Sequence, residues 1–153
     1  MRYYIFLLTA FCFIIFDQLT KVWAATNLKL GEPINIFSDY LRVALTHNYG
    51  IIFGIPTRTT IVYYLLPIIG VAIIIYLAIK NHDKTLSFCF GLLLAGAIGN
   101  LIDRIRLGYV IDFIDMGIKN LRWPTYNIAD LSIVLGCAII IIREMFFKKT
   151  KEL

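Results

Sequence analysis

Charged residues are scarce in this chain: only 16% of its 153 residues are Asp, Glu, Lys or Arg, against about 25% in an ordinary soluble domain. Hydrophobic residues account for 59% of the chain, and the mean hydropathy is +0.78. A soluble domain of this size could not bury so much apolar surface. The composition therefore predicts an integral membrane protein that forms one domain over residues 1–153.

Other absences narrow the chemistry. The three cysteines show no CxxC spacing, and an odd number cannot form a closed disulfide framework, so we expect buried inert thiols. The sequence has no Gly-rich phosphate loop and no Ser or Cys with a clear His partner. His47 and His82 are expected on opposite sides of the membrane, so they cannot share a metal. Basic residues cluster at the ends of apolar segments without a basic aromatic stripe, which argues against a nucleic-acid partner.

Four apolar runs approach the roughly 20 residues that a membrane-spanning helix needs. We expect spans over about 3–25, 60–79, 86–104 and 130–147. The stretch 26–59 places apolar and β-branched residues between turn residues, which predicts short strands on the membrane surface. The predicted fold class is an all-α membrane protein with four transmembrane helices and a small extracytoplasmic β-rich segment between helices 1 and 2.

Basic residues indicate the orientation. Seven Lys and Arg residues occupy three short segments, namely the N-terminus, the link after the second span and the C-terminal tail, and eight are spread over two long stretches. Since dense basic segments stay on the cytoplasmic side, we expect both termini in the cytoplasm. A carboxylate near a bilayer is costly, so acids there are candidate functional residues. Five acids gather at the outer face in this topology: Asp17, Asp103, Asp112, Asp115 and Asp130.

Two helical motifs each allow a functional and a structural explanation. In FDQLTK, Asp17 and Lys21 lie four residues apart, a spacing that suits an ion pair tying the top of the first span. In GNLIDR, the side chains of Asn100, Asp103 and Arg104 can share one helix face. They can line a site there, or the two charged residues can serve as interfacial anchors.

Two further motifs carry the remaining acids. In VIDFID, apolar neighbours can raise the pKa of Asp112 and Asp115, which suits proton transfer near neutral pH. The alternative is an amphipathic segment whose acids face water. In YNIADLS, Asn127 can cap the last helix with Asp130 in a variant capping box. Such a capped helix start is also a rigid platform for a catalytic carboxylate.

Glycines mark two more places in the sequence. Gly91 and Gly99, with Ala95 between them, recur every four residues and form a small-residue seam that lets another helix approach closely. In HNYG, the polar Asn48 precedes Gly50, which permits a tight backbone turn.

The five motifs FDQLTK, HNYGIIFG, GNLIDR, VIDFID and YNIADLS, in this order over nearly the whole chain, resemble those of lipoprotein signal peptidase, also called signal peptidase II. The resemblance implies a four-span aspartic endopeptidase of the bacterial cytoplasmic membrane. It implies removal of the signal peptide from diacylglyceryl-modified prolipoproteins, with the cut just before the lipidated cysteine. It also implies an active site at the outer face, contact with membrane lipid, inhibition by globomycin-type cyclic peptides, and no metal or organic cofactor.

The resemblance further assigns roles to residues. Asp112 occupies the acid position of the V-D-F motif and Asp130 that of the N-x-A-D motif, which makes them the expected catalytic pair. Eight residues are expected to bind substrate or brace the site: Asp17, Lys21, Asn48, Gly50, Asn100, Asp103, Arg104 and Asn127.

The sequence departs from the family at one point and leaves rival functions open. Ile51 and Ile52 stand where the family usually has two alanines, so larger side chains can reshape the substrate groove. One rival is a small proton- or ion-coupled transporter, because intramembrane acids serve such proteins too. Another is a structural membrane subunit that uses Asp and Arg for assembly. The outer-face position of the acids, with none at mid-membrane, favours the peptidase.

Overall fold

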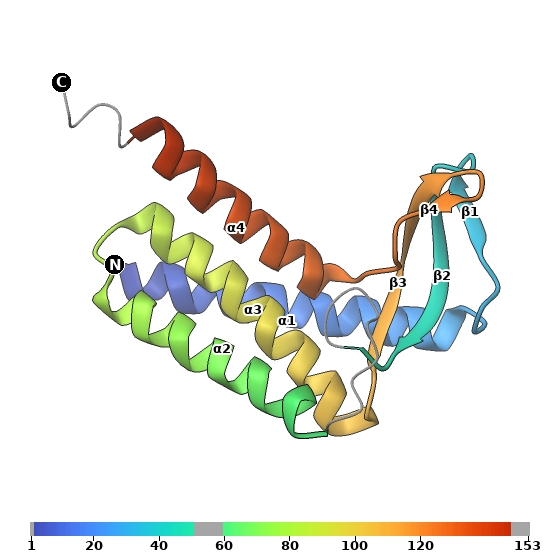
Figure 1. Ribbon diagram of the computed structural model, residues 1–153, viewed down its shortest axis with the longest axis horizontal. Helices are drawn as coiled ribbons and strands as arrows, with labels where there is room; N and C mark the ends of the chain where they lie inside the picture. Colours follow the sequence, from blue (N-terminus) through green and yellow to red (C-terminus); the bar gives the residue numbers. More distant parts are fainter. Residues whose placement is uncertain (1, 51–59, 148–153) are drawn as a thin grey trace.

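The computed structural model describes residues 2–50 and 60–147, and these residues form four helices and four strands. The helices are α1 (Arg2–Asn27), α2 (Thr60–Lys80), α3 (Lys84–Leu107) and α4 (Ile128–Phe147), and the strands are β1 (Ile34–Phe37), β2 (Leu41–Asn48), β3 (Val110–Ile118) and β4 (Leu121–Arg122). Figure 1 shows the helices gathered into a bundle with the strands at one end. Ile51 and Ile52 lie outside the described residues.

Three helices are long and apolar enough to cross a membrane: α1, α3 and the Tyr63–Lys80 part of α2. Helix α4 has 20 residues, but Asp130 lies in its first turn and Arg143 and Glu144 lie near its end. Its uncharged stretch, 131–142, is therefore shorter than the roughly 20 residues of a typical span. A mostly helical fold with a small sheet is confirmed, and the described residues provide three clear candidate spans.

Helix α3 is the centre of the bundle and contacts α1, α2 and α4. Glycines on α3 permit this close packing. A Cβ on Gly91 would lie 2.7 Å from the Cβ of Thr9 on α1, and a Cβ on Gly96 would overlap the carbonyl oxygen of Ala129 on α4. Gly91 of the predicted seam and Gly96, which lies outside it, therefore allow two neighbouring helices to approach.

The ends of α3 are capped by different means. At its start, the Asp83 carboxylate accepts a hydrogen bond from the Leu86 N–H at 2.9 Å and pairs with Arg143 of α4 at 2.8 Å. At its end, Gly108 has a left-handed backbone with φ of 79°, and its N–H donates to the Arg104 carbonyl. This glycine turns the chain from α3 into β3.

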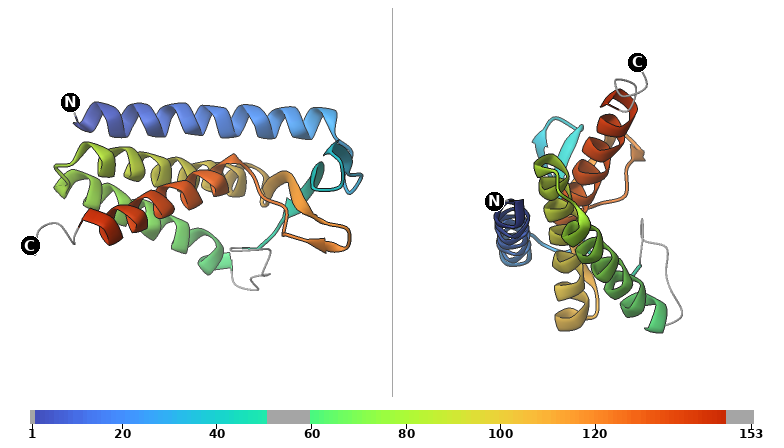
Figure 2. Two further views of the ribbon diagram at one scale, coloured as in Figure 1. Left: turned by 90° about the horizontal axis from the view of Figure 1, so that it is seen from above. Right: turned by 90° about the vertical axis from the view of Figure 1, so that its left-hand side faces the viewer.

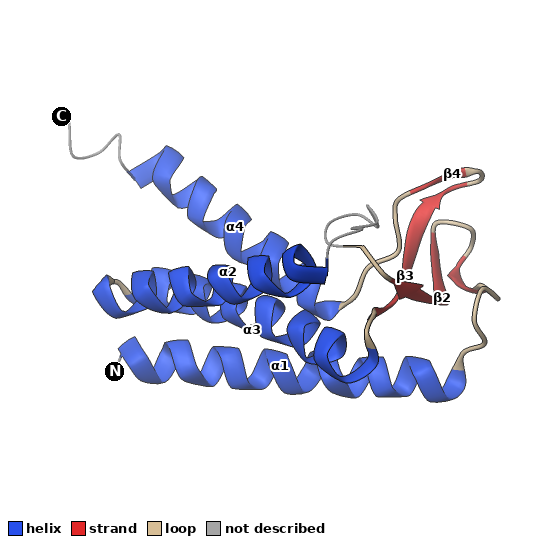
Figure 3. Ribbon diagram, turned by 60° about the horizontal axis from the view of Figure 1, so that its bottom comes forward, coloured by secondary structure: helices blue, strands red, loops and turns tan. Residues whose placement is uncertain are grey.

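The sheet is antiparallel with the strand order β1-β2-β3-β4. It differs from the expectation of strands between the first two helices alone, because β3 and β4 come from the segment between α3 and α4. The apolar run that begins at Val110 suits a buried strand, and its pairing partner β2 is far away in sequence. Figure 3 shows the strands grouped at one end of the helices.

Two buried apolar clusters connect these layers. Near the sheet, Ala24 of α1 and Leu28, just after that helix, pack with Leu45 of β2 and with Ile111 and Phe113 of β3. At the other end, a second cluster joins α1, α2 and α3: Phe6, Ala10, Ala78 and Leu94. Figure 2 shows α1 running alongside the other helices toward the sheet. Packing on α1 therefore fixes the sheet against the end of the bundle.

Replacing Gly96 by Ala should weaken the contact between α3 and α4, because the added methyl group meets Ala129 and Ile133. We expect a loss of about 1–3 kcal/mol in the free energy of unfolding, measured by denaturant titration in detergent micelles. Gly70→Ala on α2 is the matched control, since its Cβ would meet nothing within 4 Å. Equal stability of the two variants would contradict this packing.

Candidate active site

A buried lysine lies at the centre of the polar cluster between α1 and α3. The ammonium of Lys21 is 2.8 Å from Asp17 and 2.9 Å from Asp103, and it donates to the Asn100 side-chain oxygen at 3.1 Å. Lys21 has only 1% of its surface exposed and Asp17 has none. The predicted ion pair between Asp17 and Lys21 is confirmed, and a second carboxylate from α3 completes it.

The two carboxylates of this cluster also hold the elements that carry the other acids. Asp17 accepts a hydrogen bond from the Ala129 N–H in the first turn of α4 at 2.8 Å. Asp103 accepts one from the Ile111 N–H at the start of β3 at 3.1 Å. The Lys21 cluster thereby fixes the backbone one residue away from both Asp130 and Asp112.

Two asparagines connect the remaining acids. Asn100 donates through its side-chain nitrogen to Asp130 Oδ1 at 2.7 Å, and Asn127 donates to Asp112 Oδ1 at 2.7 Å. The two amides also bond each other, from Asn127 Nδ2 to Asn100 Oδ1 at 3.1 Å. Because Lys21 also donates to that oxygen, the Asn100 amide must point its nitrogen at Asp130.

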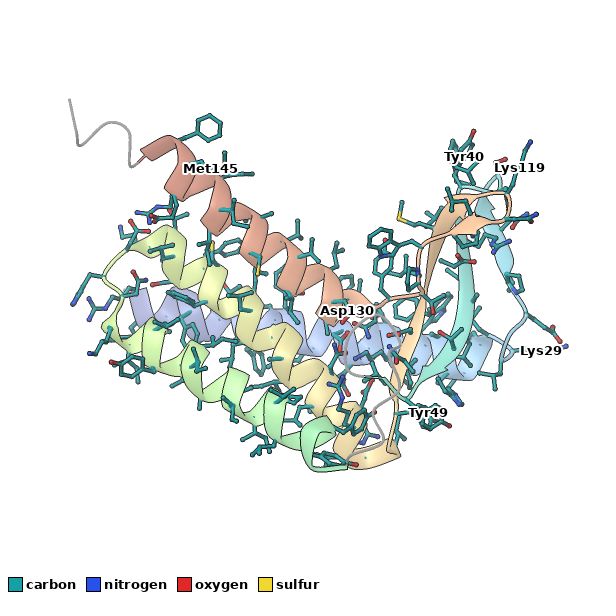
Figure 4. The ribbon with its side chains drawn as sticks, in the orientation of Figure 1. Lys29, Tyr40, Tyr49, Lys119, Asp130 and Met145 are labelled. Atoms are coloured by element: carbon teal, nitrogen blue, oxygen red, sulfur yellow. The ribbon has the colours of Figure 1, made fainter. Side chains whose placement is uncertain are left out.

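The start of α4 fixes the orientation of Asn127. Its side-chain oxygen accepts the Asp130 N–H at 2.9 Å, while Asp130 Oδ2 accepts the Asn127 N–H at 3.3 Å. This reciprocal pair is the predicted capping box. With its oxygen used in capping, Asn127 can only present its nitrogen to Asp112. Figure 4 places Asp130 at the end of α4 that faces the sheet.

Asp112 lies in β3 and is 1% exposed. Its two oxygens accept hydrogen bonds from Asn127 and, at 2.9 Å, from the side-chain nitrogen of Asn48. Burial, followed by the nearby negative charge of Asp130, raises the pKa of Asp112 from 3.8 to about 7, although the two amide donors oppose this shift. One of the two acids can therefore hold a proton at neutral pH.

A pocket of about 350 Å³ opens over Asp112. Its walls include Asn48 at the end of β2, Gly50 just after that strand, and Thr46 and Thr125 on two different segments. The Gly50 N–H donates to the Asn48 side-chain oxygen at 2.8 Å, which turns the amide nitrogen of Asn48 toward Asp112. The pocket gives a ligand access to this otherwise buried carboxylate.

Arg104 lies beside this pocket on α3. Its guanidinium donates to the Gly50 carbonyl at 3.4 Å and lies 4.9 Å from the centre of the Tyr63 ring. Thus the ten residues singled out in the sequence belong to one connected region at the sheet end of the bundle.

Asp115 occupies a separate place. Its carboxylate pairs with Arg42 of β2 at 2.7 Å and with Arg122 of β4 at 2.9 Å, and both arginines also lie within 3.6 Å of Asp39. This ion cluster joins three strands, so Asp115 braces the sheet. Among residues 2–50 and 60–147, its side chain pairs with these two arginines and not with the Lys21 cluster. In the apolar VIDFID motif, the two acids therefore have different surroundings.

Sequence reasoning missed three neighbours of the site. Gln18 donates to Asp17 and to Asp103, both at 3.2 Å, and was signalled only by its place inside FDQLTK. Thr46 and Thr125 lie in unremarkable contexts, and nothing in their local sequence indicates that they meet. Among residues 2–50 and 60–147, no three acidic, His or Cys side chains are grouped so as to hold a metal ion.

An apolar helical bundle with buried acids joined beside a pocket is the arrangement of a membrane enzyme. Residues 9–146 match the family model of Signal peptidase (SPase) II, and the chain belongs to this peptidase family. It is 38% identical over 149 residues to a lipoprotein signal peptidase of Hydrogenovibrio crunogenus, covering 94% of this chain and 86% of that protein. A Staphylococcus aureus lipoprotein signal peptidase is 36% identical over 151 residues, covering 95% and 93%.

Solved structures agree with this assignment. A bacterial membrane enzyme solved at 2.3 Å resolution superposes with a TM-score of 0.85 at 34% identity, covering 96% of this chain and 90% of that one. A second, solved at 1.9 Å resolution, gives a TM-score of 0.83 at 34% identity, with 92% of both chains covered. Membership in a peptidase family does not favour the transporter alternative.

Replacing Lys21 by Met should strongly destabilise the protein, because Asp17 and Asp103 would be left as buried, uncompensated carboxylates. We expect a loss of about 3–5 kcal/mol in the free energy of unfolding, followed by denaturant titration in detergent. Adding Asp103→Asn to this variant should restore part of the lost free energy of unfolding. Lys29→Met is the control, since the Lys29 side chain is 81% exposed. If K21M unfolds at the same denaturant concentration as K29M, Lys21 does not have this role.

Proposed function

We propose that this chain is an aspartic endopeptidase that removes signal peptides from diacylglyceryl-modified prolipoproteins and cuts just before the lipidated cysteine. Asp112 and Asp130 are its catalytic pair. The observation that carries this proposal is the chain of hydrogen bonds from Asp112 through Asn127 and Asn100 to Asp130, beside a pocket that reaches Asp112. Membership in the Signal peptidase II family supplies the reaction class.

The environments of the two acids suggest their separate roles. Asp112 is almost fully buried and its pKa is raised to about 7, so it holds the proton in the resting enzyme. Asp130 is half-buried and acts as the base. It takes a proton from a water molecule, whose oxygen attacks the peptide carbonyl carbon. Asp112 gives its proton to the carbonyl oxygen, which produces a gem-diol intermediate. Asp130 then passes the proton that it took from water to the nitrogen of the lipidated cysteine, and Asp112 takes back a proton from one of the two hydroxyls as the C–N bond breaks. The products are the free amine and a carboxylic acid, and both aspartates return to their starting states.

The surrounding residues hold this pair without touching the reacting bond. Asn100 and Asn127 present N–H groups to one oxygen of each acid, and Asn48 does so to the second oxygen of Asp112. Asp17, Lys21 and Asp103 fix the three elements from which these groups project. Arg104 and Gly50 form the wall where the substrate backbone passes. Such support preserves the geometry that proton transfer requires.

The same proposal places the enzyme in the bacterial cytoplasmic membrane as one domain over residues 1–153. Helix α4 serves as the fourth span, because Val134 and Ile141 on its surface are more than half exposed and suit contact with lipid. Helix α1 begins and α4 ends away from the sheet (Figure 1), which supports placing both ends of the bundle on one side of the membrane. The dense basic segments favour the cytoplasm as that side. The acids then lie at the outer interface, where a lipid-anchored substrate holds its scissile bond.

Lipid and inhibitors are the further partners that this site implies. Membrane lipid covers the exposed apolar faces of the helices, and the diacylglyceryl group of the substrate lies in that lipid beside the site. Globomycin-type cyclic peptides block the pocket over Asp112. Ile51 and Ile52 can change the fit of these peptides, and both lie outside the described residues.

Asp112→Asn and Asp130→Asn should each abolish cleavage while the fold remains, because each removes one half of the acid–base pair. The measurement is a gel-shift assay with purified protein in detergent, a diacylglyceryl-modified prolipoprotein and an unlipidated control substrate. Loss of at least about 100-fold in rate is expected for both variants. Asp83→Asn, at the opposite end of α3, is the matched control and should retain activity. Normal turnover by either dyad variant would refute the catalytic assignment.

Activity should fall as pH rises through about 7, because Asp112 loses the proton that the reaction needs. Its raised pKa keeps the carboxyl protonated at pH values where an ordinary aspartate is ionised. Asn48 stabilises the ionised form by hydrogen bonding, so Asn48→Ala should raise that pKa and move the alkaline limb to higher pH. Profiles of kcat/KM against pH test this. If the alkaline limb of the Asn48→Ala profile stays in place or moves to lower pH, this role of Asn48 is contradicted.

A further inference from the structure

Two threonine hydroxyls meet in the wall of the pocket over Asp112. Thr46 comes from β2 and Thr125 from the segment before α4, and their Oγ1 atoms lie 2.7 Å apart. The pairing of β2 with β3 shifts between Val43 and Thr46, so an irregularity directly precedes Thr46. Irregularities of this kind re-aim side chains near active sites. Neither threonine belongs to the polar cluster around Lys21.

The direction of these hydrogen bonds follows from counting hydrogens. Thr46 Oγ1 also lies 3.3 Å from the backbone carbonyl oxygen of Asp112, which can only accept. A hydroxyl has one hydrogen, so Thr46 donates it to that carbonyl. In the contact between the two hydroxyls, Thr125 must then be the donor. Its single hydrogen is used, and its oxygen still has lone pairs that can accept.

Thr125 lines the pocket, so a ligand that enters there can reach its oxygen, which keeps free accepting capacity. Among residues 2–50 and 60–147, no N–H or O–H group donates to Thr125 Oγ1. Its chain neighbour Pro124, which also lines the pocket, has no backbone N–H to offer a ligand. This wall therefore presents an acceptor two hydrogen bonds away from the backbone of Asp112.

We infer that Thr125 Oγ1 binds a backbone N–H of the substrate next to the scissile bond, with Thr46 fixing the direction of its hydroxyl. The inference rests on the proposed peptidase function. An extended peptide that enters the pocket buries N–H groups that need acceptors. The nearby amides are occupied, since Asn48 donates to Asp112 and accepts from Gly50. Thr125 is thus a substrate-binding residue, and Thr46 is a positioning residue that acts through it.

The test pairs enzyme variants with changes in the substrate backbone. Three lipidated peptides are compared: the natural amide, and two esters that replace the N–H of the residue before the scissile bond or of the residue after the cysteine. Each is given to the wild type, Thr125→Val and Thr125→Ser, and kcat and KM are measured separately. Valine keeps the shape of threonine without its oxygen, and serine keeps the oxygen.

On the natural amide, Thr125→Val should lose about five- to tenfold in kcat/KM, largely through KM, and Thr125→Ser should resemble the wild type. One of the two esters should lower the kcat/KM of the wild type by a similar factor. On that ester, the wild type and Thr125→Val should have equal kcat/KM. A loss by Thr125→Val that is the same on all three substrates would overturn the inference, because a merely structural brace behaves in that way.

A second variant covers the case in which Thr125→Val fails to fold. Thr46→Val removes the acceptor of the Thr125 hydrogen but leaves the Thr125 oxygen, so the difference between amide and ester should shrink, whereas Thr46→Ser, which keeps the acceptor, should retain it. An unchanged difference in Thr46→Val would contradict the positioning role of Thr46, and loss of the difference in a folded Thr46→Ser protein would contradict binding at Thr125. If the wild type cleaves none of the lipidated peptides, the proposed function itself falls, and this inference falls with it.

Discussion

The structure depends on a lysine ammonium buried between two helices. Removing a charge from water is costly unless it is paired and hydrogen-bonded, and Lys21 meets that requirement with Asp17 on its own helix and Asp103 on α3. These carboxylates also accept backbone N–H groups: the second oxygen of Asp17 accepts from Ala129, and the Asp103 oxygen that meets Lys21 accepts from Ile111 as well. One neutralised cluster thus sets the bundle, the start of α4 and the start of β3 in a single geometry.

From this constraint the arrangement of the two reactive acids follows. Asp112 and Asp130 come from a strand and a helix, and each receives an N–H from an asparagine whose amide orientation is fixed elsewhere. Asn100 is oriented by Lys21, and Asn127 by its capping of α4. Among residues 2–50 and 60–147, neither acid forms an ion pair with a basic side chain, which leaves the pair able to share a proton. The ion pairs stabilise the surroundings, and the amides hold the reacting groups.

Local patterns in the sequence predicted much of this arrangement. The apolar runs indicated the helices, the four-residue spacing indicated the pair of Asp17 and Lys21, and the capping pattern indicated the start of α4 at Asn127. The misses are non-local. The pairing of β2 with β3 joins segments separated by two helices, so no periodicity predicted that the sheet draws on both stretches. The meeting of Thr46 with Thr125 depends on the same pairing.

The central claim is that Asp112 and Asp130 form one coupled acid pair. Titration of carboxyl groups by NMR, with ¹³C-labelled aspartate in detergent-solubilised protein, tests it most directly. The signal of Asp112 is assigned as the one that is missing from the spectrum of Asp112→Asn. In the wild type this signal should titrate near pH 7. In Asp130→Asn the pKa of Asp112 should fall, because a nearby negative charge has gone, yet stay above 3.8, because burial remains. A pKa near 4 for Asp112 in both proteins would contradict the account.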